Sequence, residues 1–275
     1  MKQFFVFLVS LFTFCNVYSQ NTKETLSMTY TFNSDEELTD WFIEGEGKAT
    51  IENGQLILEP LYFPLMEVLM KNKVISDNNF TDEYYPYLIP AMRAKYGEQI
   101  RNYYLSGKGE PQFMGGHFNI WNQRIKTSRN FAIEFDFTPL SPAPLHMLMF
   151  CASGPNGESI FDTSLPTRYG IEDELLYDMT MYRVSFFHKL RKKANLRLAP
   201  GKILVAQGID TTSDNLTQTS HCRIERIEGI VKFITNGKEI FSYKEEKQLE
   251  GNNWGFRLMS CAKGAYDNIR VLTIQ

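Results

Sequence analysis

Short segments that alternate between apolar and polar residues follow one another along most of the chain. These segments are 27–32, 49–59, 131–140, 145–153, 181–190, 201–210, 222–244 and 254–274. Successive side chains of a strand point to opposite faces, so each segment predicts a strand with one apolar face. Within 222–244, the "TNGK" between two apolar runs predicts a hairpin with a two-residue turn. Many strands with no helix between them favour a sandwich or jelly roll of two antiparallel sheets.

An insertion at about 61–114 interrupts the strand pattern. From Pro90 onward, Met92, Tyr96 and Ile100 fall at helical spacing, and proline is well tolerated where a helix begins. We therefore expect a partly helical insertion in an otherwise all-β chain. It either docks on the surface through its aromatic residues or forms a lid over one end of a groove and contributes tyrosines to it.

The start of the chain has the pattern of a secretory signal peptide. Lys2 precedes an apolar run that ends at Phe14 and is too short to span a bilayer comfortably, and the small residue Ser19 follows. We expect a signal peptide at 1–19 and a single jelly-roll domain at 20–275. No later segment is apolar enough to span a membrane, so we expect export to the periplasm or secretion into the medium.

Charge and cysteine content weigh against several classes of protein. A formal net charge of −3 gives no basic surface for nucleic acid. After the signal peptide, Cys151, Cys222 and Cys261 allow at most one internal disulfide and require none. No His, Asp, Glu or Cys cluster has the spacing of metal ligands, so we expect no cofactor and no catalytic metal. A structural Ca²⁺ with oxygen ligands such as Asp35 or Asp267 stays an option.

The segment "GGHFNIWNQR" at 115–124 carries an unusual polar face. Its apolar face holds Phe118 and Ile120, and the opposite face holds His117, Asn119, Trp121 and Gln123. An imidazole, two amides and an indole in a row are more than the solubility of an open sheet face requires.

The downstream half resembles a known family. "MYRVSFFHK", followed by "ANLRLAPGKILVAQGID", is similar to the signature of the domain-of-unknown-function family 1961, and "HFNIW" is similar to another strand of that family. The matching positions are Tyr182, Ser185, Phe186, Asn195, Arg197, Pro200 and Gly201. The resemblance covers roughly residues 113–275. These are bacterial proteins with a concanavalin-like jelly roll, often found beside genes for breaking down pectic and other acidic polysaccharides.

The resemblance implies a groove on the concave sheet and an acidic oligosaccharide or polysaccharide as partner. The polar face of 115–124 would then be the floor of a glycan site, where an indole stacks on a pyranose ring and amides hydrogen-bond sugar hydroxyls. The alternative is an exposed strand whose tryptophan is covered by the insertion. β-Elimination beside a uronate needs a base, an acid and cationic or amide groups that neutralise the carboxylate. We expect the catalytic groups to be His117, Tyr182 and His188. Concanavalin-like alginate lyases use a similar set of groups. The expected substrate contacts are Asn119, Trp121, Gln123, His146, Arg183, Ser185, Asn195 and Arg197.

Strand parity limits this set. Tyr182 and His188 share one face, while Arg183 and Ser185 share the other, so both sets reach one groove only across a bulge. The face of Arg183 is the more polar and is favoured. His188 is alternatively part of a solvated strand end in "HKLRKK", and His146 is alternatively a core histidine.

The preferred interpretation is therefore a carbon–oxygen lyase, either a polysaccharide lyase or an oligosaccharide dehydratase. One alternative is a non-catalytic carbohydrate-binding protein. Another is a glycoside hydrolase that uses Glu134 and Asp136, a pair that resembles part of the Glu-x-Asp-x-x-Glu strand of laminarinase-like glycosidases. That match fails at the third carboxylate, because Thr138 and Pro139 follow.

Overall fold

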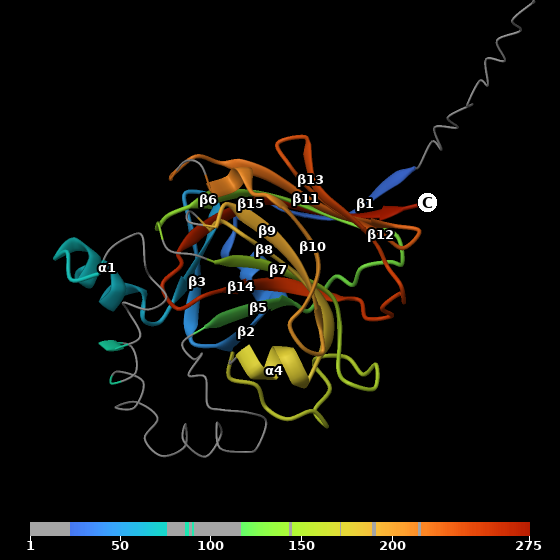
Figure 1. Ribbon diagram of the computed structural model, residues 1–275, viewed down its shortest axis with the longest axis horizontal. Coiled ribbons are helices and arrows are strands. Elements are labelled where there is room, and N and C mark those ends of the chain that lie inside the picture. The colour runs from blue at the N-terminus through green and yellow to red at the C-terminus, as the bar shows by residue number, and fades with distance from the viewer. Residues whose placement is uncertain are drawn as a thin grey trace, which may run out of the picture.

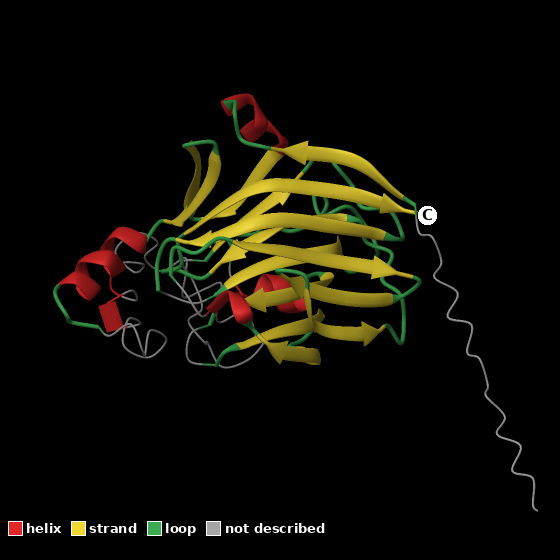
Figure 2. Ribbon diagram, turned by 90° about the horizontal axis from the view of Figure 1, so that it is seen from above, coloured by secondary structure: helices red, strands yellow, loops and turns green. Residues whose placement is uncertain are grey.

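The computed structural model describes residues 23–75, 86–87, 90, 117–142, 145–170, 172–188, 191–213 and 216–275. In these ranges the chain forms two antiparallel sheets packed face to face (Figures 1 and 2). The predicted jelly-roll sandwich is confirmed. The predicted signal peptide at 1–19 and the predicted helix after Pro90 lie outside the described residues.

One sheet has eight strands in the described part of the chain, in the order β13-β12-β11-β6-β15-β4-β3, with β1 also pairing to β15. Its strands are β1 (Glu24–Tyr30), β3 (Gly47–Glu52), β4 (Gln55–Pro60), β6 (Phe131–Pro139), β11 (Ser220–Ile227), β12 (Ile230–Thr235), β13 (Lys238–Lys244) and β15 (Gly264–Ile274).

The other sheet has seven strands in the same ranges, in the order β10-β9-β8-β7-β14-β5-β2. Its strands are β2 (Trp41–Gly45), β5 (Phe118–Asn122), β7 (His146–Ser153), β8 (Thr180–Phe186), β9 (Lys193–Ala199), β10 (Ile203–Ile209) and β14 (Asn253–Leu258).

Helical segments are short. They are η1 (Asp35–Asp40), α1 (Phe63–Lys71), α4 (Glu172–Tyr177) and η2 (Thr211–Ser213). Helix α1 lies in the predicted insertion, and Figure 1 shows it projecting beside the sandwich, whereas α4 lies against the seven-stranded sheet. No helix among the described residues is both long enough and apolar enough to cross a bilayer.

An aromatic core fills the space between the sheets. Phe135 of β6 meets Phe256 of β14 with ring centroids 5.2 Å apart, and Phe137 meets Phe186 of β8 at 5.1 Å. Such edge-to-face pairs add stability beyond the area that they bury. Because alternate residues of each strand enter this core, the residues between them must lie on the outer faces. The outer face of the seven-stranded sheet carries the site described below.

Several local predictions can be compared with the structure. Asn236 and Gly237 have φ angles of 49° and 76°, as a two-residue hairpin turn between β12 and β13 requires. Strands β2 and β9 and helix α4 were not predicted as elements. Cys151, Cys222 and Cys261 are buried free thiols.

Candidate functional site

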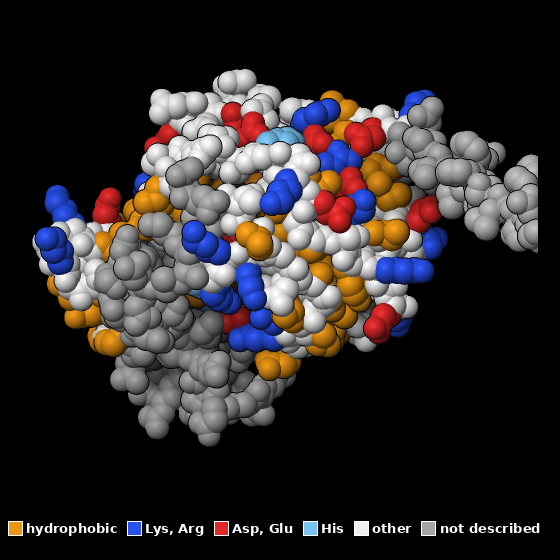
Figure 3. Space-filling view, turned by 45° about the horizontal axis from the view of Figure 1, so that its top comes forward, with side chains coloured by type: hydrophobic (Ala, Val, Ile, Leu, Met, Phe, Trp, Pro, Cys, Tyr) orange, Lys and Arg blue, Asp and Glu red, His pale blue; other side chains and the backbone are white. Residues whose placement is uncertain are grey.

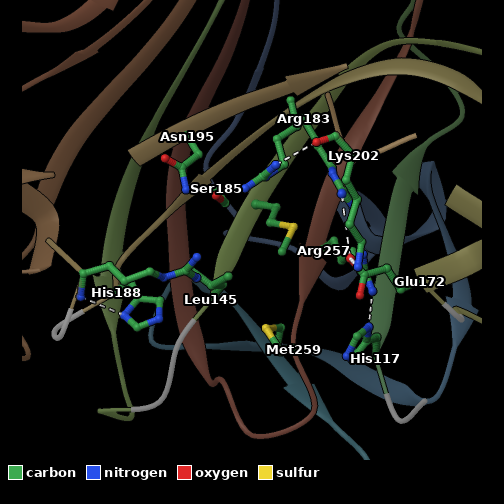
Figure 4. A pocket seen from close by; sticks show the side chains of 13 residues that line it. His117, Leu145, Glu172, Arg183, Ser185, His188, Asn195, Lys202, Arg257 and Met259 are labelled. Carbon is green, nitrogen blue, oxygen red and sulfur yellow. Dashed lines mark hydrogen bonds and ion pairs between the residues drawn. The ribbon is translucent and has the colours of Figure 1, made fainter. Parts of the chain in front are cut away.

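A cavity of about 240 Å³ opens on the outer face of the seven-stranded sheet. It lies over β7, β8, β9 and β14, and residues just outside the strands complete its wall (Figure 4). Its lining residues are His117, Leu145, Met147, Glu172, Arg183, Ser185, His188, Arg191, Asn195, Arg197, Lys202, Arg257 and Met259.

Sheet register explains why these side chains meet. Directly paired residues in neighbouring strands point to the same face. One row across the outer face is Asn119, Arg257, Met147, Ser185 and Asn195, and the next is Trp121, Gly255, Met149, Arg183 and Arg197. The first row therefore brings a guanidinium, a hydroxyl and an amide into one line, and the second adds two more guanidinium groups.

His117 precedes β5 and is held by close backbone packing. Gly45 and Gly170 have φ angles of 88° and 77°, in the region that favours glycine. A Cβ atom on Gly45 would lie 2.8 Å from the carbonyl oxygen of His117, and one on Gly170 would lie 2.7 Å from it. Two glycines thus allow three chain segments to meet behind the imidazole.

The imidazole of His117 contacts the guanidinium of Arg257, and both side chains are buried. Arginine can only donate, so the Nη2 group of Arg257 donates to Nδ1 of His117. Nδ1 therefore carries a lone pair, and the proton of the neutral ring is on Nε2. Burial, together with the positive charges of Arg257, Arg183 and Lys202, holds the pKa of His117 well below its ordinary value. The ring is neutral at pH 7.

Glu172 of α4 is the carboxylate of the cavity lining. Its Oε1 lies 3.1 Å from Nζ of Lys202 and 3.7 Å from Nη2 of Arg183. Burial raises the pKa of this carboxyl group, but the cations Arg257, Arg183 and Lys202 outweigh burial and hold the pKa below its ordinary value. Glu172 is therefore ionised and offsets part of the positive charge around it.

Positive charge still exceeds negative charge in the cavity. Burial and the neighbouring charge of Arg257 lower the pKa of Arg183 to about 10, Glu172 partly opposes this shift, and Arg197 adds to it. Arg197 also donates from Nη1 to the carbonyl oxygen of Lys202 at 2.7 Å. Figure 3 shows Lys and Arg side chains gathered on this face with few acidic neighbours. The arrangement is suited to an anionic ligand.

His188 lies on the opposite side of the cavity from His117, with Met259 between them in Figure 4. Its Nδ1 accepts a hydrogen bond from the backbone N–H of Arg191 at 3.2 Å. Burial and the charge of Arg191 lower the pKa of His188 to about 4. The carboxylate of Asp210 accepts from the backbone N–H of Phe187 at 2.5 Å and thereby fixes the turn that carries His188.

The floor between these two sides is apolar. Leu145, Met147 and Met259 form one buried cluster there. Such a surface can contact the C–H groups of a sugar ring, while the surrounding charges bind its substituents. The cavity is thus amphipathic, with an apolar floor between charged walls.

The structure brings six of the predicted site residues to this cavity: His117, His188, Arg183, Ser185, Asn195 and Arg197. Arg183 and Ser185 lie on the outer face that strand parity favoured. His188 reaches the same cavity because it follows the end of β8, where strict alternation no longer applies.

Three residues predicted on the polar face of 115–124 lie outside the cavity lining. Trp121 is fully buried in a cluster with Ile160 and with Leu175 of α4, so it offers no platform for a sugar. Asn119 donates to Glu44 at 3.0 Å. Gln123 follows the end of β5 and donates to the carbonyl oxygen of Thr39. Among the residues that the structure describes, Ile160, Leu175 and Met179 pack against Trp121, and most of the insertion to which the alternative assigned the covering role lies outside them.

Two further predicted residues face the interior. Tyr182 is buried in the core between the sheets and stacks on Phe150 with ring centroids 5.6 Å apart. His146 is buried with Nδ1 at 2.8 Å from the hydroxyl of Tyr266, and burial lowers its pKa to about 3. Tyr182 does not face the groove as predicted, because it alternates with Arg183 along β8 and therefore points to the opposite face. His146 is a core histidine, which was the alternative interpretation of that residue.

Glu134 and Asp136 share the outer face of the eight-stranded sheet, away from the cavity. The carboxylate of Glu134 is bound by Arg223 and, at 3.0 Å, by Arg270. Asp136 is 2.9 Å from Nδ1 of His221. Both carboxylates are thus engaged in ion pairs on the sheet opposite the cavity.

Sequence reasoning missed the cavity residues Glu172, Arg191, Lys202 and Arg257. Arg257 had a usable signal, because Trp254, Phe256 and Leu258 alternate with it and enter the core. Glu172 lies in a helix of six residues, which is too short for helical periodicity to be read. Among the residues that the structure describes, no three His, Cys, Asp or Glu side chains gather as a metal ion would need.

Comparisons with known proteins agree with this architecture. The chain is 29% identical to the "Uncharacterized protein YesU" of Bacillus subtilis (strain 168) over 169 residues, which are 56% of this chain and 76% of YesU. A crystal structure described as a protein of unknown function with a galectin-like fold from Bacillus subtilis matches with a TM-score of 0.65. That match has 22% identity and covers 92% of this chain and 98% of the other.

A more distant fold neighbour is the carbohydrate recognition domain of Emp46p in its metal-free form. Its TM-score is 0.51 at 10% identity, with 89% of this chain and 94% of the other covered. The family described as "Domain of unknown function (DUF1961)" matches residues 97–271. The predicted family is confirmed, and the chain belongs to it.

Proposed function

We propose that the chain is a carbon–oxygen lyase that acts by β-elimination on oligo- or polysaccharides containing uronic acid. The observation that carries this proposal is the neutral imidazole of His117, held by the guanidinium of Arg257 within a cationic cavity. An uncharged base beside several cations is the combination that proton abstraction next to a carboxylate requires.

Binding of the substrate carboxylate is the first step. Arg183 and Lys202 flank Glu172 and leave donors directed at the cavity, and a guanidinium can bind a carboxylate through two hydrogen bonds. Neutralising this carboxylate acidifies the proton on C5 of a uronate, because negative charge develops on the carboxylate in the transition state.

Proton transfer to Nδ1 of His117 follows when Arg257 turns its donor from Nδ1 to the bound carboxylate, which frees the lone pair of that ring nitrogen. A bound carboxylate attracts donors of Arg257 and offsets its charge, which raises the pKa of His117 in the complex. Nδ1 takes the C5 proton, the C–H electron pair forms the C4–C5 double bond, and the C4–O bond breaks with its electron pair on oxygen.

The leaving oxygen then needs a proton. We assign this step to the same imidazole, which carries the abstracted proton and lines the cavity. An imidazolium beside Arg257 is electrostatically unfavourable, which drives the proton on to the oxygen. Abstraction and donation by one ring require both groups on one face of the sugar, which is a syn elimination.

The leaving group decides between two versions of this reaction. If a sugar leaves, the chain is cut and the protein is a polysaccharide lyase. If water leaves, the chain stays intact and the protein is an oligosaccharide dehydratase. The cavity offers the same catalytic groups in both cases, and the mass of the product distinguishes them.

A second candidate is a non-catalytic carbohydrate-binding protein. It is favoured by the similarity of the fold to the carbohydrate recognition domain of Emp46p. Both candidates place an acidic saccharide in the cavity, and both fit a protein that is exported to the periplasm or secreted.

The deciding experiment incubates the protein with uronate oligosaccharides and follows ultraviolet absorbance of the new double bond together with product mass. We expect elimination in the wild type and a loss of about 1,000-fold or more in His117→Ala, since general base catalysis is removed. The matched control is His221→Ala, which removes an imidazole from the opposite sheet. Binding without new absorbance would favour the carbohydrate-binding protein, and full turnover by His117→Ala would refute the assigned base.

A further inference from the structure

The cavity carries more positive charge than one carboxylate needs. Among the residues that the structure describes, its lining contains the five cations Arg183, Arg191, Arg197, Lys202 and Arg257, and one acidic residue, Glu172. The contacts of Glu172 are with Lys202 and Arg183, so its charge offsets cations on one side only. Within the described ranges, no carboxylate lies within ion-pair distance of Arg191 or Arg197.

These cations repel one another. Arg183 and Arg197 are directly paired across β8 and β9, on the same face of the sheet. The charge of Arg197 disfavours the charged form of Arg191 as well as that of Arg183. Like charges held together in a partly buried place cost folding free energy, so their retention on one face needs a compensating ligand.

The cations divide into two groups around the apolar floor. Glu172, Lys202 and Arg257 lie with His117 on one side of Figure 4, whereas His188 lies on the other. Arg191 belongs to the side of His188, because its backbone N–H bonds to that ring at 3.2 Å. Leu145, Met147 and Met259 provide an apolar surface between the two sides.

We propose that the cavity binds saccharides that carry two anionic groups, with the second anion held by Arg191 and Asn195 beside His188. This inference rests on the proposed uronate site, which takes the first anion. The second anion is either a sulfate ester or another carboxylate, since guanidinium groups bind both. Asn195 lines the same region and offers an amide donor for either.

The test measures affinity by calorimetry with two matched pairs of ligands. One pair is a saturated chondroitin disaccharide, which has one uronate, without and with a sulfate ester. The other pair is galacturonate and digalacturonate. The second anion should strengthen binding by about tenfold or more in at least one pair, as a charge-assisted hydrogen bond does.

Variants assign this gain to a residue. In Arg191→Gln the two members of the favoured pair should bind with nearly equal affinity, while the singly charged member keeps its wild-type affinity. Arg129→Gln is the matched control, because Arg129 is a surface arginine whose guanidinium bonds to Gln248 outside the cavity. It should retain the full gain.

The outcomes separate this inference from the proposed reaction. A gain that depends on Arg191 without any new ultraviolet absorbance supports the second anion and refutes elimination. Elimination with no gain in either pair, or a gain that persists in Arg191→Gln, refutes the second anion and leaves the lyase standing. Absence of binding by all four ligands overturns both.

Discussion

The outer faces of the two sheets use charge in opposite ways. On the eight-stranded sheet, Arg223 contacts Glu24, Glu134 and Glu225, and Glu134 also contacts Arg270, so each charge has partners of the other sign. On the seven-stranded sheet, the described lining of the cavity gathers five cations around one acidic residue, Glu172.

The difference separates charges that serve the fold from charges that are held for a ligand. Paired surface charges stabilise modestly and keep a sheet soluble. Unbalanced buried charges weaken the fold, and such charges gather at functional sites, so we infer that this face is held for a ligand. Removing a charge from each face therefore has opposite consequences, and the following experiments test this contrast.

The largest expected effect is on ligand affinity. Arg183→Gln should weaken binding of a uronate oligosaccharide by about 10- to 100-fold, because a charge-assisted hydrogen bond is lost. Arg270→Gln, on the opposite sheet, should change the dissociation constant by less than about twofold. Equal losses in the two variants, measured by calorimetry, would show that the effect is one of overall charge.

The next effect is on the pH dependence of stability. His117 is buried with a pKa below that of the unfolded chain, so its contribution is present above pH 6.5 and is lost as the pH falls below that value. The slope of unfolding free energy between pH 6.5 and 4.5 is at most about 1.4 kcal/mol per pH unit for each such imidazole. His117→Gln should flatten the curve in denaturant titrations.

A second buried imidazole gives an internal check on that slope. His146, with a pKa of about 3, is buried against Phe137 and is not in the cavity lining. His146→Gln should reduce the slope of unfolding free energy over the same pH window. The glutamine keeps a hydrogen-bond partner for Tyr266, and ligand affinity should stay unchanged. An unaltered slope in both variants would contradict the assignment of neutral buried rings.

The smallest effect is on stability at pH 7. Arg223→Gln should lower the unfolding free energy by about 1 kcal/mol, since the carboxylates around it lose a shared partner in a partly exposed network. Arg183→Gln should not lower it, because the loss of a long ion pair with Glu172 is offset by relief of repulsion from Arg257 and Arg197. A larger loss of unfolding free energy in Arg183→Gln than in Arg223→Gln would contradict the proposed difference between the two sheet faces.

Alternation was enough to predict the fold, because the strands that pack on the core repeat it clearly. Phe135 and Phe137 enter the core while Glu134 and Asp136 point outward, as period two requires. Strand β2 was not predicted because the adjacent residues Phe42 and Ile43 are both apolar and both exposed, so apolar and polar residues do not alternate there. Helix α4 is too short to show a period.

The site was only partly predictable for a different reason. Parity decides which face a side chain takes, and this placed Arg183 and Ser185 on the outer face. Parity does not reveal what covers that face. The burial of Trp121 under Leu175, which is more than fifty positions away in the sequence, depends on a tertiary contact that no local pattern records.

The glycine pair behind His117 has a consequence for the tolerance of the chain to mutation. Since any side chain at 45 or 170 would meet the carbonyl oxygen of His117 at under 3 Å, a library of substitutions selected for function should be depleted at both positions. The depletion would extend even to alanine. Two sites more than a hundred residues apart in sequence would then show the same intolerance, and neither would contribute a single atom to the lining of the cavity.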